Sequence, residues 1–347
     1  MKLEERIEAF AELGKKISNG LEGKDIGISD DLNYIIDKQQ NNNEWFTPEN
    51  VRMSLRAIAD MLIMDNLTKW TNAYPALTEV RKPFNIGVIM AGNIPLVGFH
   101  DFLSVLITGN NLLAKTSSKD GELILFINKL LCGINPEFTG KVKFTDSTLT
   151  GFDAIIATGS DNSSRYFEYY FGKYPNIIRK NRNSLAIIDG NESDTELQGL
   201  GKDIFSYFGL GCRNISKILV PAGYDFSVMI RNWEIYAGVI NHTKYANNYD
   251  FSKAVYLVNK EKFIDTGYLI LMENSGLSSP VAVVFYEYYD SPEKVSEITE
   301  NLEKKIQCIA GKKNIPFGNA QSPYLWDYAD GIDTIEFLLK KFSPGIS

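Results

Sequence analysis

The chain has 347 residues, of which 44% are hydrophobic and 23% charged, and its formal net charge is −7. A chain of this length suffices for about two domains and buries roughly three quarters of the surface that it exposes when unfolded, so it needs no disulfide or metal for stability. The negative charge and the lack of a basic run argue against nucleic acid or an anionic membrane surface as a partner.

The amino terminus, MKLEERIEAF, lacks the apolar stretch of a secretory signal, and no run of about 18 apolar residues occurs that would span a membrane. We therefore expect a cytoplasmic protein. The three cysteines, Cys132, Cys212 and Cys308, are too few and too scattered for a disulfide framework or a zinc site. We expect thiols and no metal. The two histidines, His100 and His242, leave few candidates for a base that activates a nucleophile.

Residues 1–80 are predicted to be mostly helical. The first helical run has apolar residues at helical spacing: Leu3, Ile7, Phe10, Leu13 and Ile17. Residues 51–70 form a second, long amphipathic run. Asn- and Asp-rich segments separate the two runs. We expect this helical segment to pack on the domain that follows it.

From Asn85 onward, short β-prone runs alternate with helical ones, which is typical of βαβ units on a parallel sheet. The predicted strands are 85–91, 111–116, 141–145, 154–158 and 185–188, and the helices between them are 96–108, 121–131 and 162–174. Gly109 is placed to end a helix in the left-handed conformation. Residues 81–205 thus predict a doubly wound, Rossmann-type α/β domain for a dinucleotide. The usual G-x-G-x-x-G fingerprint is missing, and Gly199-Leu200-Gly201 follows no obvious strand.

After Cys212 the pattern is less regular. We predict a second α/β domain over residues 206–347, although no linker marks its start. Its candidate elements are strands at 216–220, 254–258 and 281–286 and a helix over 292–310, whose apolar face would carry Val295, Ile298, Leu302, Ile306 and Ile309.

Cys212 is the cysteine with the most reactive surroundings. It follows two glycines, Gly209 and Gly211, that permit unusual backbone angles, and it precedes the guanidinium of Arg213; both features favour a thiolate. The alternative is that Cys212 is a small buried hydrophobe, which is the interpretation we adopt for Cys132 and Cys308.

Asn93 lies between the first predicted strand and a helix that a proline, Pro95, can begin. An amide at this point can face the crevice at the carboxyl edge of the sheet. There it could supply, with a backbone N–H, the two donors that the oxyanion of an attacked carbonyl requires. Capping of the following helix is the structural alternative.

Two further strand ends carry candidate cofactor ligands. Lys115, with Thr116 and Ser117 after it, ends the second strand and can bind ribose hydroxyls or a phosphate, although a solvated surface lysine would look the same. Thr158, Gly159 and Ser160 join a strand to a helix and supply a glycine turn and helix N-terminal N–H groups that suit a pyrophosphate. Many strand-to-helix turns share this pattern.

Taken in chain order, these segments resemble the aldehyde dehydrogenase superfamily, and more closely its acyl-CoA reductase branch, the LuxC-like fatty acyl reductases. The resemblance covers about residues 85–340 and rests on the order and spacing of five short stretches, 91–95, 108–110, 115–117, 158–160 and 316–319, together with Cys212. It implies a Rossmann-type nucleotide-binding domain and a second α/β catalytic domain.

The resemblance also implies a role for each candidate residue. Cys212 would be the nucleophile, Asn93 the oxyanion amide, and Lys115 a ligand of the ribose or 2′-phosphate. The implied reaction is the NADPH-dependent reduction of a fatty acyl thioester, acyl-CoA or acyl-protein, to an aldehyde through an acyl-cysteine. NADPH rather than NADH rests on the resemblance and on Lys115 with Lys119 nearby, so NADH stays open.

The sequence departs from the hydrolytic members of that superfamily. They place a glutamate ahead of the nucleophile to activate water, whereas residues 179–182 here read Arg-Lys-Asn-Arg. The glutamate that usually holds the nicotinamide ribose has no match near residues 276–281 either. Loss of the water-activating carboxylate suits an enzyme that must keep its acyl-cysteine from hydrolysis until hydride arrives.

Other functions stay open. A hydrolytic aldehyde dehydrogenase would need Glu192 or Glu196 as its base, and a cysteine acyltransferase would need one of the two histidines. A nucleotide-binding scaffold without catalysis would present its N-terminal helices to a partner such as an acyl-activating subunit. We expect a homo-oligomer, because such folds often dimerise. One aromatic stripe at helical spacing is expected to lie in the core rather than line an acyl channel: Tyr166, Tyr169, Tyr170 and Phe171.

Overall fold

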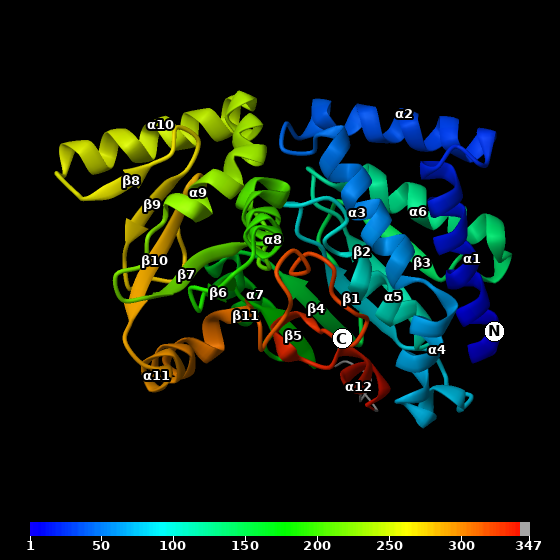
Figure 1. Ribbon diagram of the computed structural model, residues 1–347. Helices are drawn as coiled ribbons and strands as arrows, with labels where there is room; N and C mark the ends of the chain where they lie inside the picture. The colour runs from blue at the N-terminus through cyan, green and yellow to red at the C-terminus, as the bar shows by residue number, and fades with distance from the viewer. Residues whose placement is uncertain (341–347) are drawn as a thin grey trace. The chain divides into compact units, whose positions relative to one another are not determined.

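The computed structural model describes residues 1–340, and its contacts divide the chain into two units (Figure 1). The first comprises residues 1–180 together with the segment that begins at Pro323, and the second comprises residues 181–322. The sequence analysis predicted a domain boundary between residues 205 and 206, whereas the second unit begins at residue 181. The second unit therefore contains one strand (183–187) and one helix (194–205) that were predicted to belong to the first domain. The predicted second domain also included residues 323–340, which return to the first unit, and residues 341–347, which lie outside the described part.

The first unit opens with four helices: α1 (Leu3–Leu21), α2 (Ile26–Asn42), α3 (Pro48–Met61) and α4 (Met64–Asn72). The Asn- and Asp-rich stretch predicted to separate two helical runs is itself α2, because buried Leu32, Ile36 and Gln39 give it a narrow packing face. The single run predicted over 51–70 is two helices, α3 and α4, which are separated at Leu62 and Ile63. The helical character of this segment is confirmed.

A five-stranded parallel sheet with the order β3-β2-β1-β4-β5 follows these helices. Its strands are β1 (Asn85–Ile89), β2 (Asn111–Lys115), β3 (Val142–Thr145), β4 (Ala154–Thr158) and β5 (Asn176–Arg179). The connecting helices are α5 (Phe99–Ile107), α6 (Gly121–Ile134) and α7 (Asp161–Phe171), and a C-terminal helix, α12 (Thr334–Leu339), also belongs to this unit. The doubly wound sheet is confirmed, but its fifth strand is β5, which the sequence pattern missed, and not residues 185–188.

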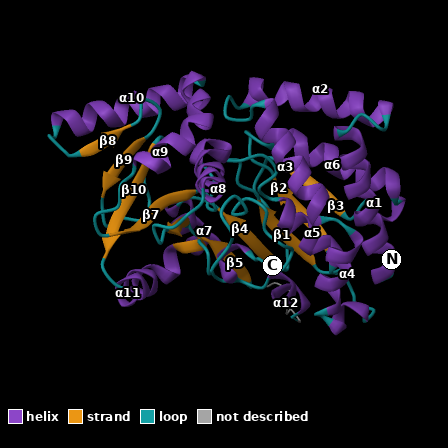
Figure 2. Ribbon diagram, viewed as in Figure 1, coloured by secondary structure: helices purple, strands orange, loops and turns teal. Residues whose placement is uncertain are grey.

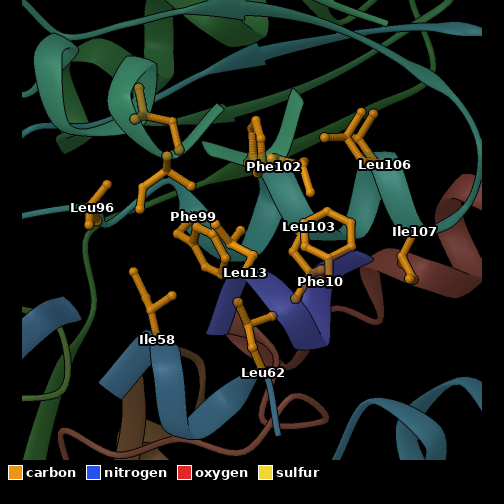
Figure 3. Packing of buried hydrophobic residues seen from close by; sticks show 14 of the residues in the cluster. Phe10, Leu13, Ile58, Leu62, Leu96, Phe99, Phe102, Leu103, Leu106 and Ile107 are labelled. Carbon is orange, nitrogen blue, oxygen red and sulfur yellow. The ribbon is translucent and has the colours of Figure 1, made fainter. Parts of the chain in front are cut away.

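The core of the first unit joins the N-terminal helices to the sheet. Phe10 and Leu13 of α1 pack with Phe99, Phe102 and other apolar residues of α5 (Figure 3), and each such fully buried side chain contributes roughly 1.5–3 kcal/mol. Gly109 ends α5 with a φ of +83°, as predicted. A Cβ there would lie 2.4 Å from a guanidinium nitrogen of Arg6 on α1, so glycine also permits this close approach.

The second unit contains a six-stranded sheet with the order β11-β6-β7-β10-β9-β8, parallel except for the edge strand β8 (Figure 2). Its strands are β6 (Asn183–Ile187), β7 (Ile215–Pro221), β8 (Phe263–Asp265), β9 (Ile270–Glu273), β10 (Val283–Tyr289) and β11 (Ile306–Ala310). Its helices are α8 (Asp194–Phe205), α9 (Ser227–Trp233), α10 (Thr243–Val258) and α11 (Pro292–Leu302). Short 3₁₀ turns join several elements, among them residues 206–209 and 234–241.

Two element predictions in the second unit were wrong. Residues 254–258, predicted as a strand, end α10, because Tyr245, Tyr249 and Ser252 set a helical burial period while the β-prone residues face solvent. The helix predicted over 292–310 ends at Leu302, and residues 306–310 form β11, in which burial alternates. Ile306 and Ile309 happen to continue the helical spacing, which concealed the change of period.

The aromatic residues of α7 differ from their prediction. The side chains of Tyr166, Tyr169 and Tyr170 are 66%, 82% and 60% exposed, whereas Phe171 packs edge-on against the ring of Phe152. Only Phe171 therefore lies in the core. Among residues 1–340, no helix is both long and apolar enough to cross a membrane.

Candidate active site

The carboxyl ends of three neighbouring strands bring most of the predicted site residues to one edge of the first sheet. β1 lies between β2 and β4 and is parallel to both. The loops that follow these strands carry Asn93, Lys115–Ser117 and Thr158–Ser160. In parallel α/β sheets this edge is where ligands bind.

Asn93 is exposed on the loop between β1 and α5 (residues 90–98), which we call the Asn93 loop. Three side chains hold this loop. Asn43, at the end of α2, donates to the carbonyl of Gly92 at 3.5 Å, and Ser54 of α3 donates to the carbonyl of Pro95 at 2.7 Å. Asp120 accepts the backbone N–H of Leu96 at 2.7 Å. The N-terminal helices thus contribute directly to the position of the candidate oxyanion amide.

Lys115 is half-buried at the end of β2, and its carbonyl accepts the N–H of Met90 at 3.0 Å, which extends the ladder beyond β1. Ser117 makes contacts within its own loop and with the Asn93 loop, and its role as a cofactor ligand stays a prediction. Its hydroxyl accepts the N–H of Lys119 at 3.2 Å, and a Cβ added at Gly92 would lie 2.4 Å from that oxygen. Ser117 therefore closes its own loop and supports the Asn93 loop from below.

The turn after β4 has the features that a phosphate group requires. Ser160 caps α7 by accepting the N–H of Ser163 at 3.4 Å, and a Cβ at Gly159 would lie 2.8 Å from the Cβ of Ser163. Glycine therefore lets the chain pass close to the first turn of α7, whose N–H groups attract anions. The hydroxyl of Thr158 accepts a bond from Arg179 at 3.5 Å. These residues and Lys115 are the candidates for binding a dinucleotide.

A buried ion pair lies beside this turn. Arg179 of β5 donates two hydrogen bonds to Asp101 of α5, at 2.5 and 2.8 Å, and a third to Thr334 of α12 at 3.1 Å. Both charged side chains are 6% exposed. The pair links α5, β5 and the C-terminal segment, so Arg179 has a structural role.

Cys212 lies in the second unit, on the loop between α8 and β7, and is partly exposed. Ahead of it three successive residues have left-handed backbone angles: Tyr207 at φ +51°, Phe208 at +57° and Gly209 at +78°. The left-handed conformation costs a non-glycine residue about 1–2 kcal/mol. The chain therefore stores strain immediately before the candidate nucleophile, and the surrounding contacts must hold it.

Asn214 makes several of the hydrogen bonds that hold the strained turn before Cys212. Its buried side-chain amide donates to the carbonyls of Asp203, Ile204 and Ser206 at the end of α8, at 3.0, 3.3 and 2.7 Å. Its side-chain oxygen accepts the N–H of Gly211 at 2.8 Å. One amide thus joins the end of α8 to the residue before Cys212.

Ser184 of β6 holds the other side of the loop. Its hydroxyl donates to the carbonyl of Cys212 at 2.9 Å and accepts the N–H of Cys308 at 3.1 Å. Cys308 is buried on β11, not on a helix as predicted, and Cys132 packs on the core of the first unit from α6. Both agree with a structural role, and Cys212 is the cysteine on a polar, bent loop.

Arg213, whose guanidinium was expected to favour a thiolate at Cys212, makes a hydrogen bond to another segment. Its Nε donates to the carbonyl of Ala320 at 2.5 Å. Buried Asp203 accepts the N–H groups of Gly318 and Ala320 at 2.7 and 3.0 Å, and burial raises the pKa of Asp203 to about 6. Arg213 and Asp203 therefore fasten the segment 316–320 to the Cys212 loop.

The groups that the alternative functions need are committed elsewhere. Glu192 accepts the N–H groups of Asp189 and Gly190, and Glu196 forms a capping box with Ser193 at the start of α8. His100 is buried with a lowered pKa, because burial disfavours its charged form, and its Nε2 is 2.9 Å from the carbonyl of Leu325.

His242 caps α10 by accepting the N–H of Tyr245 at 3.4 Å, and its ring lies 4.3 Å from that of Phe208. Gly199 and Gly201, the glycines of the discounted dinucleotide pattern, both lie within α8. A Cβ at Gly201 would lie 2.5 Å from the ring of Tyr236, so this glycine serves helix packing.

Asn93 and the candidate cofactor residues thus share one sheet edge, and Cys212 belongs to the other unit. The sequence missed the residues that hold these loops: Asp120, Ser184, Asp203 and Asn214. For Asn214 a signal was present, since an amide two residues after a candidate nucleophile and near a helix end is typical of a loop-closing side chain. The other three gave no local signal.

Comparisons with known proteins agree on one family. The family model "Acyl-CoA reductase (LuxC)" matches residues 29–227, more than half of the chain. A curated relative, a long-chain acyl-protein thioester reductase from Photorhabdus laumondii, is 22% identical over 252 residues. These residues are 64% of this chain and 52% of that protein, so the chain spans about half the length of this relative.

Solved structures show the same fold. Aldehyde dehydrogenase 21 from Physcomitrella patens, in complex with succinate, has a TM-score of 0.67 and 13% identity over 90% of this chain and 74% of its own. An aldehyde dehydrogenase from Bacillus cereus, in complex with NAD⁺, has a TM-score of 0.61 and 14% identity over 89% of this chain and 72% of its own. At these identities the similarity concerns the fold alone.

Proposed function

The chain belongs to the acyl-CoA reductase (LuxC) family of oxidoreductases, and from this premise we propose that it reduces a fatty acyl thioester to an aldehyde through an acyl-cysteine on Cys212. The observation that carries this proposal is the Cys212 loop. It carries the partly exposed Cys212 just after a strained turn, and Asn214 and Ser184 hold the loop through hydrogen bonds to Gly211 and Cys212.

In the first step the Cys212 thiolate attacks the carbonyl carbon of the thioester. A carbon–sulfur bond forms, the bond to the carrier sulfur breaks, and the carrier leaves as a thiolate that takes up a proton. The Asn93 amide and a backbone N–H near Cys212 are the proposed donors to the oxyanion that forms between these events. Both loops are held by buried side chains, which supports this proposal.

The residues at the edge of the first sheet would hold a nicotinamide cofactor, which would supply the hydride when bound in its reduced form. The turn 158–160 and the start of α7 would bind its phosphates, and Lys115 would bind the ribose or its 2′-phosphate. Collapse of the reduced adduct breaks the carbon–sulfur bond and frees Cys212. One hydride and one proton are consumed for each aldehyde and each carrier thiol released.

NADPH is the cofactor that we propose, because Lys115 and Lys119 are the charged side chains of residues 115–119 and the carboxyl of Asp120 is buried against Leu96. The name of the Photorhabdus relative supports a protein-bound thioester as one donor, and acyl-CoA, named by the family model, as the other. We further propose a cytoplasmic homo-oligomer that receives its substrate from an acyl-activating partner.

The test is purified protein with NADPH and tetradecanoyl-CoA, with loss of cofactor absorbance followed and the aldehyde trapped. Cys212→Ser is expected to form no acyl-enzyme and no aldehyde, whereas the control Cys132→Ser keeps both. Asn93→Ala is expected to lower kcat by about 10²–10³, the usual effect of losing one oxyanion donor. Aldehyde formation by Cys212→Ser, or oxidation of NADH at lower concentration than NADPH, would show that the corresponding part of the proposal is wrong.

A further inference from the structure

Asp120 occupies the N-cap position of α6, yet its side chain does not cap that helix. An aspartate at this position ordinarily accepts a backbone N–H from the first turn of its own helix. Here Oδ2 accepts the N–H of Leu96 instead, at 2.7 Å, and the other oxygen, Oδ1, is buried without a hydrogen-bond partner among residues 1–340. The side chain has therefore been turned away from local structure toward another loop.

The residue that Asp120 holds is itself constrained. Leu96 has a φ of +58°, in the left-handed region that L-residues rarely adopt. Its side chain is 5% exposed and belongs to the apolar cluster that contains Phe99 (Figure 3). Packing fixes the side chain of Leu96 and Asp120 fixes its N–H, so together they maintain a backbone conformation that the residue alone would leave.

The connection spans the two loops that carry the candidate chemistry. Asp120 ends the loop that begins at Lys115, and its own N–H donates to the carbonyl of Ser117 at 3.2 Å. Leu96 lies three residues after Asn93 in the Asn93 loop. Ser117 also lies directly against Gly92. The two loops thus touch at one point through Gly92 and Ser117 and are tied at a second point through Asp120.

The surroundings of Asp120 favour the neutral carboxyl group. Burial raises its pKa to about 8. The Asn93 loop contains no charged residue, and the nearest element from the N-terminal region, α3, offers the hydroxyl of Ser54 to Pro95. Lys115 and Lys119 belong to the same loop as Asp120, and Glu122 of α6 is bonded to Lys38 and Gln39 of α2. Within residues 1–340, the influences on the pKa of Asp120 are its burial and its hydrogen bond to Leu96.

We propose that Asp120 is a positioning residue that ties the Asn93 loop to the Lys115 loop, so that the oxyanion amide and the cofactor-binding residues keep one fixed arrangement. This inference rests on the proposed function for its catalytic meaning, while the tie itself is a property of the first unit. The closed arrangement binds the carboxyl proton more tightly than a solvent-exposed aspartate does, so the tie weakens as pH rises toward the pKa of Asp120.

The experiment compares Asp120→Asn, Asp120→Ala and, as a matched control at another helix N-cap, Asp25→Asn. Amide hydrogen exchange of residues 91–98 and NADPH affinity by fluorescence titration are measured from about pH 6 to about pH 9. Asn keeps an acceptor for Leu96 and resembles the neutral carboxyl in shape, so protection and affinity are expected to match those of the natural protein at neutral pH. Ala removes the acceptor, and we expect roughly tenfold weaker NADPH binding and faster exchange of the loop.

The pH profile separates positioning from a general effect on folding. The natural protein and Asp25→Asn are expected to lose loop protection and NADPH affinity progressively as pH rises toward about 8 and to level off above it, whereas Asp120→Asn, which cannot ionise, shows no such loss. The inference is wrong if Asp120→Ala protects the loop as well as the natural protein does, or if Asp120→Asn keeps the same pH profile. If the natural protein neither binds NADPH nor reduces a thioester, the proposed function fails, and the exchange data still decide whether Asp120 ties the loops. Should Asp120→Ala not fold, the pH profile of Asp120→Asn decides alone.

Discussion

Asn214→Ala is the most informative single substitution in the second unit. It leaves the buried N–H of Gly211 without its acceptor, which costs about 1–3 kcal/mol, and it removes the donor shared by three carbonyls at the end of α8, where each net hydrogen bond contributes about 0.5–1.5 kcal/mol. The amide has two hydrogens for three carbonyls, and the 3.3 Å contact to Ile204 is the weakest. We therefore expect a loss of about 2–4 kcal/mol in the free energy of unfolding.

Two assays measure this effect. Urea unfolding gives the change in stability, and the rate of iodoacetamide alkylation, followed by mass spectrometry of the Cys212 peptide with Cys132 as internal reference, reports the local state of the loop. Without Asn214 the strained turn before Cys212 is expected to relax, so the alkylation rate of Cys212 changes while that of Cys132 does not. The control is Asn248→Ala, which removes one hydrogen bond to Lys244 within α10 and should cost about 1 kcal/mol or less. Equal losses in the two variants, with Cys212 alkylation unchanged, would refute the reasoning.

Three further predictions concern stability. Asp101→Ala leaves a buried arginine without its carboxylate, so the free energy of unfolding measured in urea should fall by about 3–5 kcal/mol. Glu79→Ala removes one partner of an exposed ion pair and is the control. An equal loss in the two variants would contradict the prediction. Asp203 has a folded-state pKa of about 6, above its ordinary 3.8, so its proton is bound more tightly in the folded state and its contribution to stability falls by about 3 kcal/mol as pH rises through that window. Asp203→Asn removes this term, so the natural protein should lose stability relative to the variant between those pH values, and a constant difference would exclude the effect. Gly201→Ala should be destabilising because its Cβ would lie 2.5 Å from an aromatic ring, whereas Gly133→Ala, with nothing within 4 Å, should gain up to about 1 kcal/mol, and thermal unfolding of both variants tests the contrast.

The sequence predicted the first sheet well because its strands are short apolar runs with clear ends. Residues 154–158 were placed at their observed bounds, since four consecutive buried residues are followed by Thr158 and Gly159. β5 escaped because two of its four residues are Asn176 and Arg179, and because the partner that stabilises Arg179, Asp101, lies 78 residues earlier. A strand whose burial depends on so distant a contact has no local pattern.

In the second unit, the strand propensity of individual residues gave a wrong prediction at positions where tertiary packing determines a helix. Val255 and Val258 favour a strand by propensity, yet both are exposed on α10, and the buried residues of that helix are Tyr245 and Tyr249. The N-cap of helix α10 is His242, and histidine is not among the residues that typically indicate a helix start in a sequence.

The residues of the candidate site also differ in whether the sequence alone could indicate them. Asn93, Lys115 and Cys212 could be proposed from the sequence because motif order needs no knowledge of contacts, and their roles stay predictions. Asp120 and Asp203 were not found, because each acts on backbone groups that only folding brings near, 24 residues away in one case and 115 in the other.

The two N-terminal side chains that hold the Asn93 loop set a limit on truncation. A fragment that begins at residue 81 would retain every strand of the five-stranded sheet, but it would lack Asn43 and Ser54, two of the side chains that hold that loop. It would also expose the apolar face of α5 that packs against α1. Any shortened version intended for biocatalysis must therefore reach back to α2, and grafting the sheet alone onto another scaffold would leave the oxyanion amide unsupported.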